Sequence, residues 1–156
     1  EVKADVLNVL PTMRAGAIAV RTGLANMNAR WCGVNFLTFE STVAKDVHVL
    51  GDSIQIAPGM PKSGHMANSQ AKVAAAAIVA QLNGWPVNPA PMINNTCYSY
   101  VDAKNVIHVA SVHQYVAAEK TFKTVAGSGG VSSAPNELEG TYAWSWARTI
   151  WADSLA

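Results

Sequence analysis

Charged side chains are scarce in this sequence. Only 13% of its 156 residues are Asp, Glu, Lys or Arg, whereas an ordinary domain carries about 25%. Half of the residues are hydrophobic and the formal net charge is +1, which excludes an intrinsically disordered chain and gives no basic surface for nucleic acid. The length is enough for one domain, but the polar coat is thin for a free-standing domain of this size.

Long apolar runs are missing as well. The richest segment, Val73–Leu82, is shorter than the roughly 18 residues that a membrane-spanning helix needs, and it contains Gln81. We therefore expect no membrane span. The sequence starts at Glu1 without a methionine or a signal-peptide pattern, and we expect a processed chain or a piece of a longer product.

Cysteine is rare, and the positions of Cys32 and Cys97 exclude several kinds of site. There is no Cys-x-x-Cys or Cys-x-x-Cys-His motif, so we expect no zinc site and no covalently attached haem. A disulfide between the two cysteines stays open. The apolar neighbours of Cys32 favour a buried side chain, whereas the polar neighbours of Cys97 favour an accessible, reactive thiol.

Periodicity and chain-breaking residues predict a mixed fold. The expected strands are Lys3–Leu10, Asn35–Ser41, Val47–Asp52, Cys97–Val101 and Val106–Val116, and the expected helices are Arg14–Gly23, Ala67–Leu82 and Glu137–Leu155. The helix after Ala67 is apolar nearly all the way round, which predicts that it is buried. Ile54–Gly64 and Gly127–Ser133 are expected as loops, the second a flexible one, and the three prolines of 85–91 indicate a boundary.

The Gly51-Asp52 pair closes an apolar run just before a loop and a long helix. In this order of elements the glycine permits close backbone approach and the carboxylate can accept hydrogen bonds from sugar hydroxyls. The helix start beyond it offers free N–H groups to an electron-rich carbonyl or an anionic flavin ring. The alternative interpretation is a solvent-facing aspartate in a turn. A Gly-x-Gly-x-x-Gly fingerprint for ADP is absent from the sequence.

Several short strings together resemble one family. They are Lys3–Pro11, Trp31-Cys32-Gly33-Val34, Thr38-Phe39-Glu40-Ser41, Met60-Pro61-Lys62-Ser63-Gly64, Ala67-Asn68-Ser69-Gln70 with Lys72-Val73-Ala74, and Asn95-Thr96-Cys97-Tyr98-Ser99. In this order they resemble the flavoprotein subunit of flavocytochrome c sulfide dehydrogenase. The resemblance spans nearly the whole chain but only the carboxyl-terminal part of that subunit.

The resemblance implies a fold and a set of partners. It implies an α/β portion of a glutathione-reductase-like flavoprotein in residues 1–84, part of a nucleotide-binding region, followed by a small α+β domain with an antiparallel sheet in residues 85–156. FAD would be the cofactor and sulfide the substrate. The partners would be an amino-terminal half of the same flavoprotein and a c-type cytochrome subunit. The family is periplasmic, which implies the same compartment here. The periplasm is oxidising, which suits a redox-active disulfide.

The same resemblance implies the site residues. Cys97 would be one half of a redox-active disulfide whose other cysteine lies in the amino-terminal half, so Cys32 would not be its partner. Hydrosulfide would attack this disulfide, and the electrons would pass through FAD to a haem on the cytochrome subunit. The residues implied to bind FAD are Gly51, Asp52, Lys62, Ser63, Gly64, Ala67, Asn68 and Trp146.

Other interpretations remain beside this one. Residues after about Trp85 could form a non-catalytic interaction module that binds the cytochrome subunit through its aromatic surface. A sulfide:quinone reductase-like flavoprotein would need a basic amphipathic terminal helix, and the terminal helix here has only Arg148. His65 stands where the family commonly has Tyr or Phe, and we expect a structural role for it. We expect the same of the scattered His48, His108 and His113.

Overall fold

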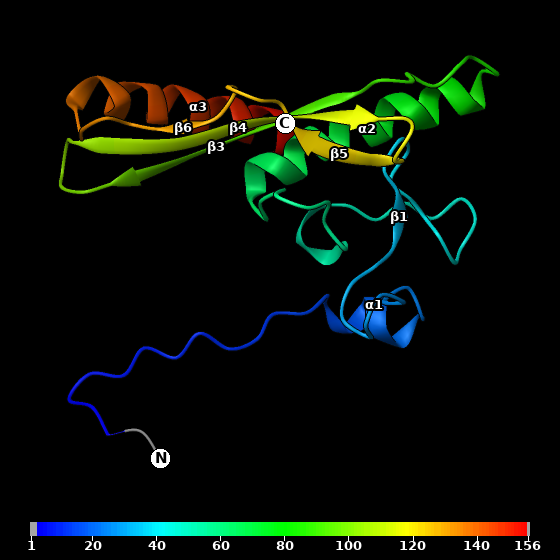
Figure 1. Cartoon of the computed structure of the whole chain (residues 1–156), viewed down its shortest axis with the longest axis horizontal. Helices are drawn as coiled ribbons and strands as arrows, with labels where there is room; N and C mark the ends of the chain where they lie inside the picture. Colours follow the sequence, from blue (N-terminus) through cyan, green and yellow to red (C-terminus); the bar gives the residue numbers. More distant parts are fainter. Residues whose placement is uncertain (1–2, 156) are drawn as a thin grey trace.

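The structure is a computed structural model of the chain, and it describes residues 3–155. Its elements are α1 (Ala17–Arg21), β1 (Val34–Asn35), β2 (Glu40–Ser41), the 3-10 helix η1 (Gly51–Ser53), α2 (Gly64–Leu82), β3 (Met92–Tyr100), β4 (Val106–Val116), β5 (Thr121–Thr124), β6 (Gly130–Val131) and α3 (Glu137–Leu155). Figure 1 shows α3 lying along the long β3–β4 hairpin, while α1 and the extended segment before it lie apart from the sheet.

The alternating segments predicted after residue 96 form an antiparallel hairpin. β3 and β4 pair from Met92 opposite Gln114 to Tyr100 opposite Val106, and β5 and β6 both pair with β4. Within the described residues β3 is therefore an edge strand. The predicted helix Glu137–Leu155 is confirmed with the same bounds.

Helix α2 starts at Gly64, three residues before the predicted start, because Ser63 caps it. Ser63 Oγ accepts a hydrogen bond of 3.0 Å from the Met66 N–H. Two side chains of α2 then bond to the outer edge of β3: the Thr96 N–H donates to His65 Nδ1 at 2.9 Å, and Ser69 Oγ donates to the Asn94 carbonyl at 3.0 Å. Side chains of α2 thus satisfy backbone groups that an edge strand would otherwise expose.

One core joins the loops before α2 to the sheet after it. Phe39, Ile54, Met66 and Phe122 are all buried in it. The Phe122 ring, which is 0% exposed, lies 6.3 Å from the ring of Phe39 and 5.8 Å from that of Tyr115. Segments 1–84 and 85–156 thus share apolar contacts, and their division into two domains stays a prediction.

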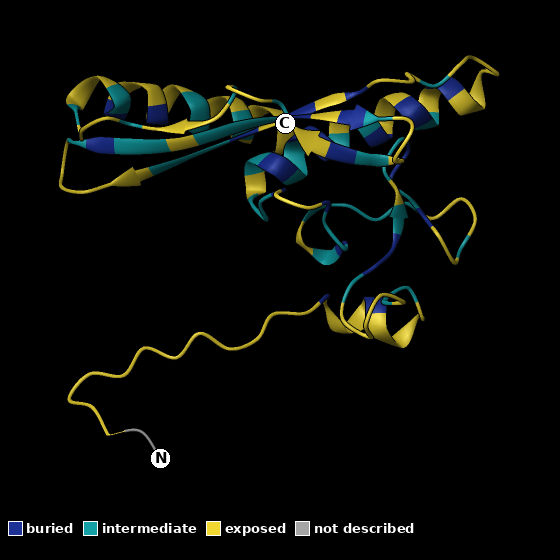
Figure 2. Ribbon diagram, viewed as in Figure 1, coloured by how far each residue is buried: buried dark blue, intermediate teal, exposed yellow. Residues whose placement is uncertain are grey.

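Three predicted strands are wrong. Lys3–Leu10 is extended and exposed but pairs with no strand among the described residues, as the exposed tail of Figure 2 shows. Asn35–Ser41 is a tight hairpin whose two-residue strands β1 and β2 pair with each other. Val47–Asp52 holds only an isolated bridge from His48 to Glu40 before η1 begins, because backbone groups of this segment bond to the β1–β2 hairpin.

Two further expectations need correction. Helix α2 is covered on one side only: Ala74 and Ala77 are buried, whereas Val79 and Leu82 are 50% and 82% exposed. The segment Gly127–Ser133 contains β6 and is held to β4 by the Ser128 and Ser132 hydroxyls, so it is more than a flexible loop.

These observations confirm the α+β part of the predicted fold class with its antiparallel sheet. In residues 3–155 the only parallel pairing is an isolated bridge between Cys32 and Ile54. A glutathione-reductase-like architecture for the intact flavoprotein stays a prediction.

Candidate functional site

The Gly51-Asp52 turn lies against the start of α2, as the order of elements predicted. The Gly51 N–H donates to Gln70 Oε1 at 2.6 Å. Gly51 has a φ of +71°, and a Cβ at this position would lie 3.2 Å from Ala67 Cβ. The left-handed backbone and the close approach to Ala67 both favour glycine here. The predicted residues Gly51 and Ala67 are therefore in contact.

Lys62 holds the backbone of the Gly51-Asp52 turn in place. Its ammonium donates to the backbone carbonyls of Asp52 at 2.6 Å and Ile54 at 2.8 Å, and Nζ lies 3.8 Å from the centre of the Trp31 ring. Burial lowers the pKa of Lys62, while the negative charge of Asp52 acts in the opposite direction. The Asp52 residue itself is exposed, so its carboxylate is open to a hydroxyl ligand.

The first turn of α2 offers unpaired donors. Within residues 3–155 the N–H groups of Gly64 and His65 donate no hydrogen bond, since the Ser63 cap takes the N–H groups of Met66 and Ala67. Gly64 is exposed, and a Cβ built on it would meet no atom within 4 Å. Free N–H groups at a helix start fit an electron-rich oxygen, such as one on the pyrimidine ring of a flavin.

Cys97 is connected to this helix start through one buried side chain. Asn95, which is 3% exposed, accepts a hydrogen bond from the Ser63 hydroxyl, and its Nδ2 lies 3.5 Å from Cys97 Sγ. Residues two apart on a strand share a face, so Asn95 and Cys97 lie on the same side of β3. The Ser63 bond fixes the Asn95 carbonyl and turns its amide group toward the thiol.

Cys97 carries a free, half-buried thiol. Cys32 is also free, but it is 0% exposed and packs in a separate cluster with Ala15 and Ala19. Burial raises the pKa of Cys32. The structure thus has no Cys32–Cys97 disulfide, and Cys97 is the more accessible of the two thiols.

The sheet face beside Cys97 is incompletely covered. Val109 stands opposite Cys97 and Val131 stands opposite Val109, so the three side chains form a row on one face. Val109 is 47% exposed and Val131 is 67% exposed. An uncovered apolar row next to a free thiol suits contact with a ligand ring or with another chain segment.

The comparison with known families bears on this hairpin. Residues 89–155 match the family described as flavocytochrome c sulphide dehydrogenase, flavin-binding. The match begins three residues before β3 and extends to the end of α3, and it includes Cys97 and Trp146.

The match to this flavin-binding family confirms the predicted resemblance for the carboxyl-terminal portion of the chain. The family is a component of a flavoenzyme, and its cofactor is FAD. Among residues 3–155 no helix has the length and apolar character needed to cross a membrane.

Trp146 and Asn68 lie on the other side of the flavin-binding domain's sheet from Cys97. The Trp146 ring packs 5.5 Å from the ring of Tyr98, whose side chain alternates with that of Cys97. A cavity of about 480 Å³ between α2 and α3 is lined by Asn68, Trp146 and His65, among others. The structure thus brings the other predicted residues to the turn and the start of α2, whereas Asn68 and Trp146 line the cavity between α2 and α3.

The other tryptophans of α3 do not converge on this cavity. Trp144 is 56% exposed and Trp151 is 52% exposed, and with Arg148 and Leu155 they follow one stripe of the helix at spacings of three, four and seven. This outer stripe therefore presents an exposed aromatic surface outside the cavity between α2 and α3.

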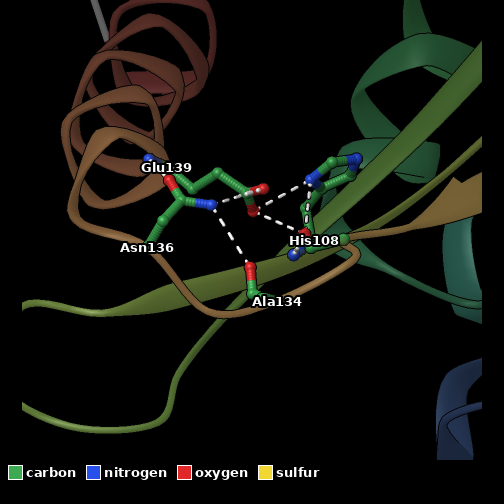
Figure 3. Close-up of polar contacts among 5 residues, drawn as sticks. His108, Ala134, Asn136 and Glu139 are labelled. Carbon is green, nitrogen blue, oxygen red and sulfur yellow. Dashed lines mark hydrogen bonds and ion pairs between the residues drawn. The ribbon is translucent and has the colours of Figure 1, made fainter.

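A cluster of Ser132, His108 and Glu139 has the composition of a catalytic triad without its geometry (Figure 3). His108 Nδ1 lies 2.9 Å from both Ser132 Oγ and Glu139 Oε2, and the serine hydroxyl donates to the same carboxylate oxygen at 2.6 Å. A triad needs the serine and the carboxylate on different imidazole nitrogens. The serine hydroxyl already donates its hydrogen bond to the carboxylate, so this serine is not activated.

The cluster instead fastens α3 to the sheet. Asn136 caps the helix by accepting from the Glu139 N–H at 2.9 Å, while its amide donates to Glu139 Oε1 at 3.1 Å, a reciprocal capping arrangement. Hydrogen bonds from Ser132 and then from His108 lower the pKa of Glu139. The structural role expected for His108 agrees with these contacts.

Sequence analysis missed Asn95 and expected only a structural role for His65. Asn95 could have been found from its position two residues before Cys97, since a period of two places both on one strand face. The contacts of His65 with Thr96 and Trp146 could not have been foreseen, because these partners are 31 and 81 residues away in the sequence.

Proposed function

We propose that this chain supplies the carboxyl-terminal, flavin-facing part of a sulfide dehydrogenase. The observation that carries the proposal is the connection from the α2 start through Asn95 to the free thiol of Cys97. It joins a place suited to a flavin oxygen with a group suited to sulfur chemistry, and Cys97 lies in the segment that matches a flavin-binding family.

FAD would lie along the Gly51-Asp52 turn and the start of α2. Asp52 would accept hydrogen bonds from the ribityl hydroxyls, and the N–H groups of Gly64 and His65 would donate to the flavin ring. Lys62 and Ser63 would keep the turn and the helix cap in place, as they do in the structure. When bound, FAD supplies an acceptor for two electrons that can leave one at a time to a haem.

Cys97 would act in a disulfide with a cysteine of an amino-terminal half of the same flavoprotein. Hydrosulfide attacks one sulfur of this disulfide, so that a new S–S bond forms on that cysteine while the old S–S bond breaks. The other cysteine leaves as a thiolate and takes the electron pair of the broken bond. The amide of Asn95, 3.5 Å from Sγ, is positioned to donate to a thiolate on Cys97.

The proposed partner for the electrons is a c-type cytochrome subunit, and the proposed compartment is the periplasm. The family's name joins the flavin-binding protein to a cytochrome, which supports the partner. A functional disulfide requires an oxidising compartment, which supports the location.

The decisive experiment is Cys97→Ser in the intact enzyme, with Cys32→Ser as the matched control. We expect sulfide-dependent reduction of cytochrome c to fall by about a thousandfold or more, since a serine oxygen cannot form the disulfide. The control should keep its activity if the protein folds, because the Cys32 side chain is 0% exposed and packs with Ala15 and Ala19. Unchanged turnover in Cys97→Ser would exclude the proposed role.

A second candidate function rests on the outer stripe of α3. Trp144 and Trp151, half exposed on either side of Arg148, suit a protein interface in which this segment binds the cytochrome subunit without taking part in the chemistry. Replacing both tryptophans with alanine should then weaken cytochrome binding by about a hundredfold while FAD binding is unaffected. Equal binding of the cytochrome by the variant would contradict this function.

A further inference from the structure

One imidazole nitrogen joins three elements next to the candidate site. His65 Nδ1 accepts a hydrogen bond of 2.9 Å from the Thr96 backbone N–H and one of 3.2 Å from Trp146 Nε1–H. His65 is in the first turn of α2, Thr96 precedes Cys97 on β3, and Trp146 is in the middle of α3. The two rings lie 5.6 Å apart and nearly perpendicular, at 82°, so the edge of the indole meets the imidazole.

These contacts define the protonation state of His65. Both neighbours are donors that cannot accept a hydrogen bond, so Nδ1 must carry its lone pair and the proton must be on Nε2. A proton on Nδ1 would point toward the Thr96 and Trp146 N–H groups and would remove both hydrogen bonds. The neutral imidazole is therefore the form that fits this position.

The charges around His65 also favour the neutral ring. The start of α2 carries the positive end of the helix dipole, and burial lowers the pKa of His65, with a further contribution from Lys72. The other titratable or charged groups facing this place are Asp153 and Tyr142 of α3, which line the same cavity, and Tyr98 of β3. Asp153 is 2.6 Å from Lys72 Nζ and paired with it.

We propose that His65 is a positioning residue, whose neutral imidazole holds Trp146 of α3 and the Thr96 edge of β3 against the start of α2. Its relevance to sulfide oxidation rests on the proposed function, but the contact itself does not. Protonation of His65 removes the acceptor and releases Trp146 from α2, so this part of the site is fixed at neutral pH and loosens in acid.

The test is the indole Nε1–H signal of Trp146, followed by NMR in the 156-residue chain across pH 7.5 to about 4.5, with Trp146→Phe identifying the signal. In the wild type we expect the signal to shift and its protection against exchange, relative to a free indole at the same pH, to fall by about tenfold as His65 protonates. In His65→Asn, whose Oδ1 occupies the position of Nδ1 and does not titrate, the signal should stay protected throughout. In His65→Phe it should be unprotected at every pH.

The comparison between wild type and His65→Asn decides the proposal even if His65→Phe fails to fold. The same pH shift in His65→Asn would overturn it, since the signal would then report another group such as His108, which lies 6.1 Å from the Tyr98 ring. A Trp146 signal that does not change with pH in the wild type would overturn it too. Neither outcome touches the role of Cys97, which the activity of Cys97→Ser tests separately.

Discussion

Residues 15–62 and residues 63–155 satisfy their backbones in different ways. The second region is regular: two 19-residue helices and a hairpin pair most of their own groups. The first is mostly loops, held by single hydrogen bonds between distant positions, such as the Ala15 N–H to the Arg30 carbonyl and the Cys32 N–H to the Ser53 carbonyl. Loops of this kind depend on particular side chains, whereas the regular region depends on periodic patterns.

The exposed apolar surface divides in the same way. Val6, Leu7, Val9 and Leu10 before the first region are more than half exposed, as are several aromatic residues of α3. Exposed apolar surface before the first region and on the second agrees with the low charge content and with a chain that binds a cofactor or other chain segments. The proposed amino-terminal half and cytochrome subunit would cover it.

The largest expected effect tests whether the two regions depend on each other. Phe122→Ala removes a ring that is 0% exposed and touches Phe36, Phe39 and Tyr115. We expect the free energy of unfolding in urea to drop by about 3–5 kcal/mol, because the cavity lies where both regions meet. The signals of Trp31 and Trp146 should report the unfolding of both regions in a single urea transition. If only one region unfolded, the shared core would not couple them.

The next effect is confined to the second region. Gly140 lies in α3, and a Cβ there would come within 2.6 Å of the Lys104 carbonyl. We expect Gly140→Ala to lower the thermal midpoint, at a cost of about 1–3 kcal/mol, because α3 must move away from the hairpin. Gly64→Ala is the control for stability alone, since its Cβ would meet nothing within 4 Å. Equal midpoints for both variants would contradict the close contact.

Both predictions depend on contacts that the sequence did not reveal. The hairpin and α3 were predicted from local signals, namely alternation and a helix without breakers. The alternation in Asn35–Ser41 had another cause: Phe36 and Phe39 both reach the core from a turn, with Phe39 at a φ of +58°. A left-handed phenylalanine carries no signal of its own, since glycine is the residue that marks such positions.

The residues of the candidate site also divide into those marked by a local motif and those that depend on contacts across the fold. Gly51, Ser63 and Cys97 were predicted from short motifs, and local geometry supports their placement near the α2 start. Asn95 was missed, and the partners of His65 were not foreseen, because the contacts of both residues come from across the fold. Trp146 was predicted near the flavin by resemblance alone, and its place on the other sheet face could be known only from the packing of α3.

A smaller effect should be confined to the first region. Lys62→Met keeps most of the stem but removes the ammonium that binds the Asp52 and Ile54 carbonyls. We expect a loss of about 1–3 kcal/mol in local stability, seen as faster hydrogen exchange at the Cys32 and Gln55 amides. Exchange in β3 and β4 should stay the same. The control is Lys45→Met, since Lys45 makes only an exposed ion pair of 3.9 Å with Asp46.

The smallest effect is a pH dependence in the second region. Hydrogen bonds from Ser132 and His108 lower the pKa of Glu139 in the folded chain. This contribution to stability is present above the usual pKa of a glutamate and is lost as the pH falls through the lowered folded value. Glu139→Gln should therefore flatten the dependence of the unfolding midpoint on pH in that acidic range, in addition to a small loss at neutral pH.

The control for this variant is Glu137→Gln, whose carboxylate is exposed and lies 3.8 Å from Lys104. Its acid profile should follow the wild type, because an exposed pair shifts stability little. A steep acid profile that survives in Glu139→Gln would mean that the Ser132 and His108 contacts do not hold α3 to the sheet. Residues 63–155 would then depend on their periodic packing alone. Their difference from the loops of residues 15–62, which are held by single hydrogen bonds, would be larger than the hydrogen bonds drawn in Figure 3 indicate.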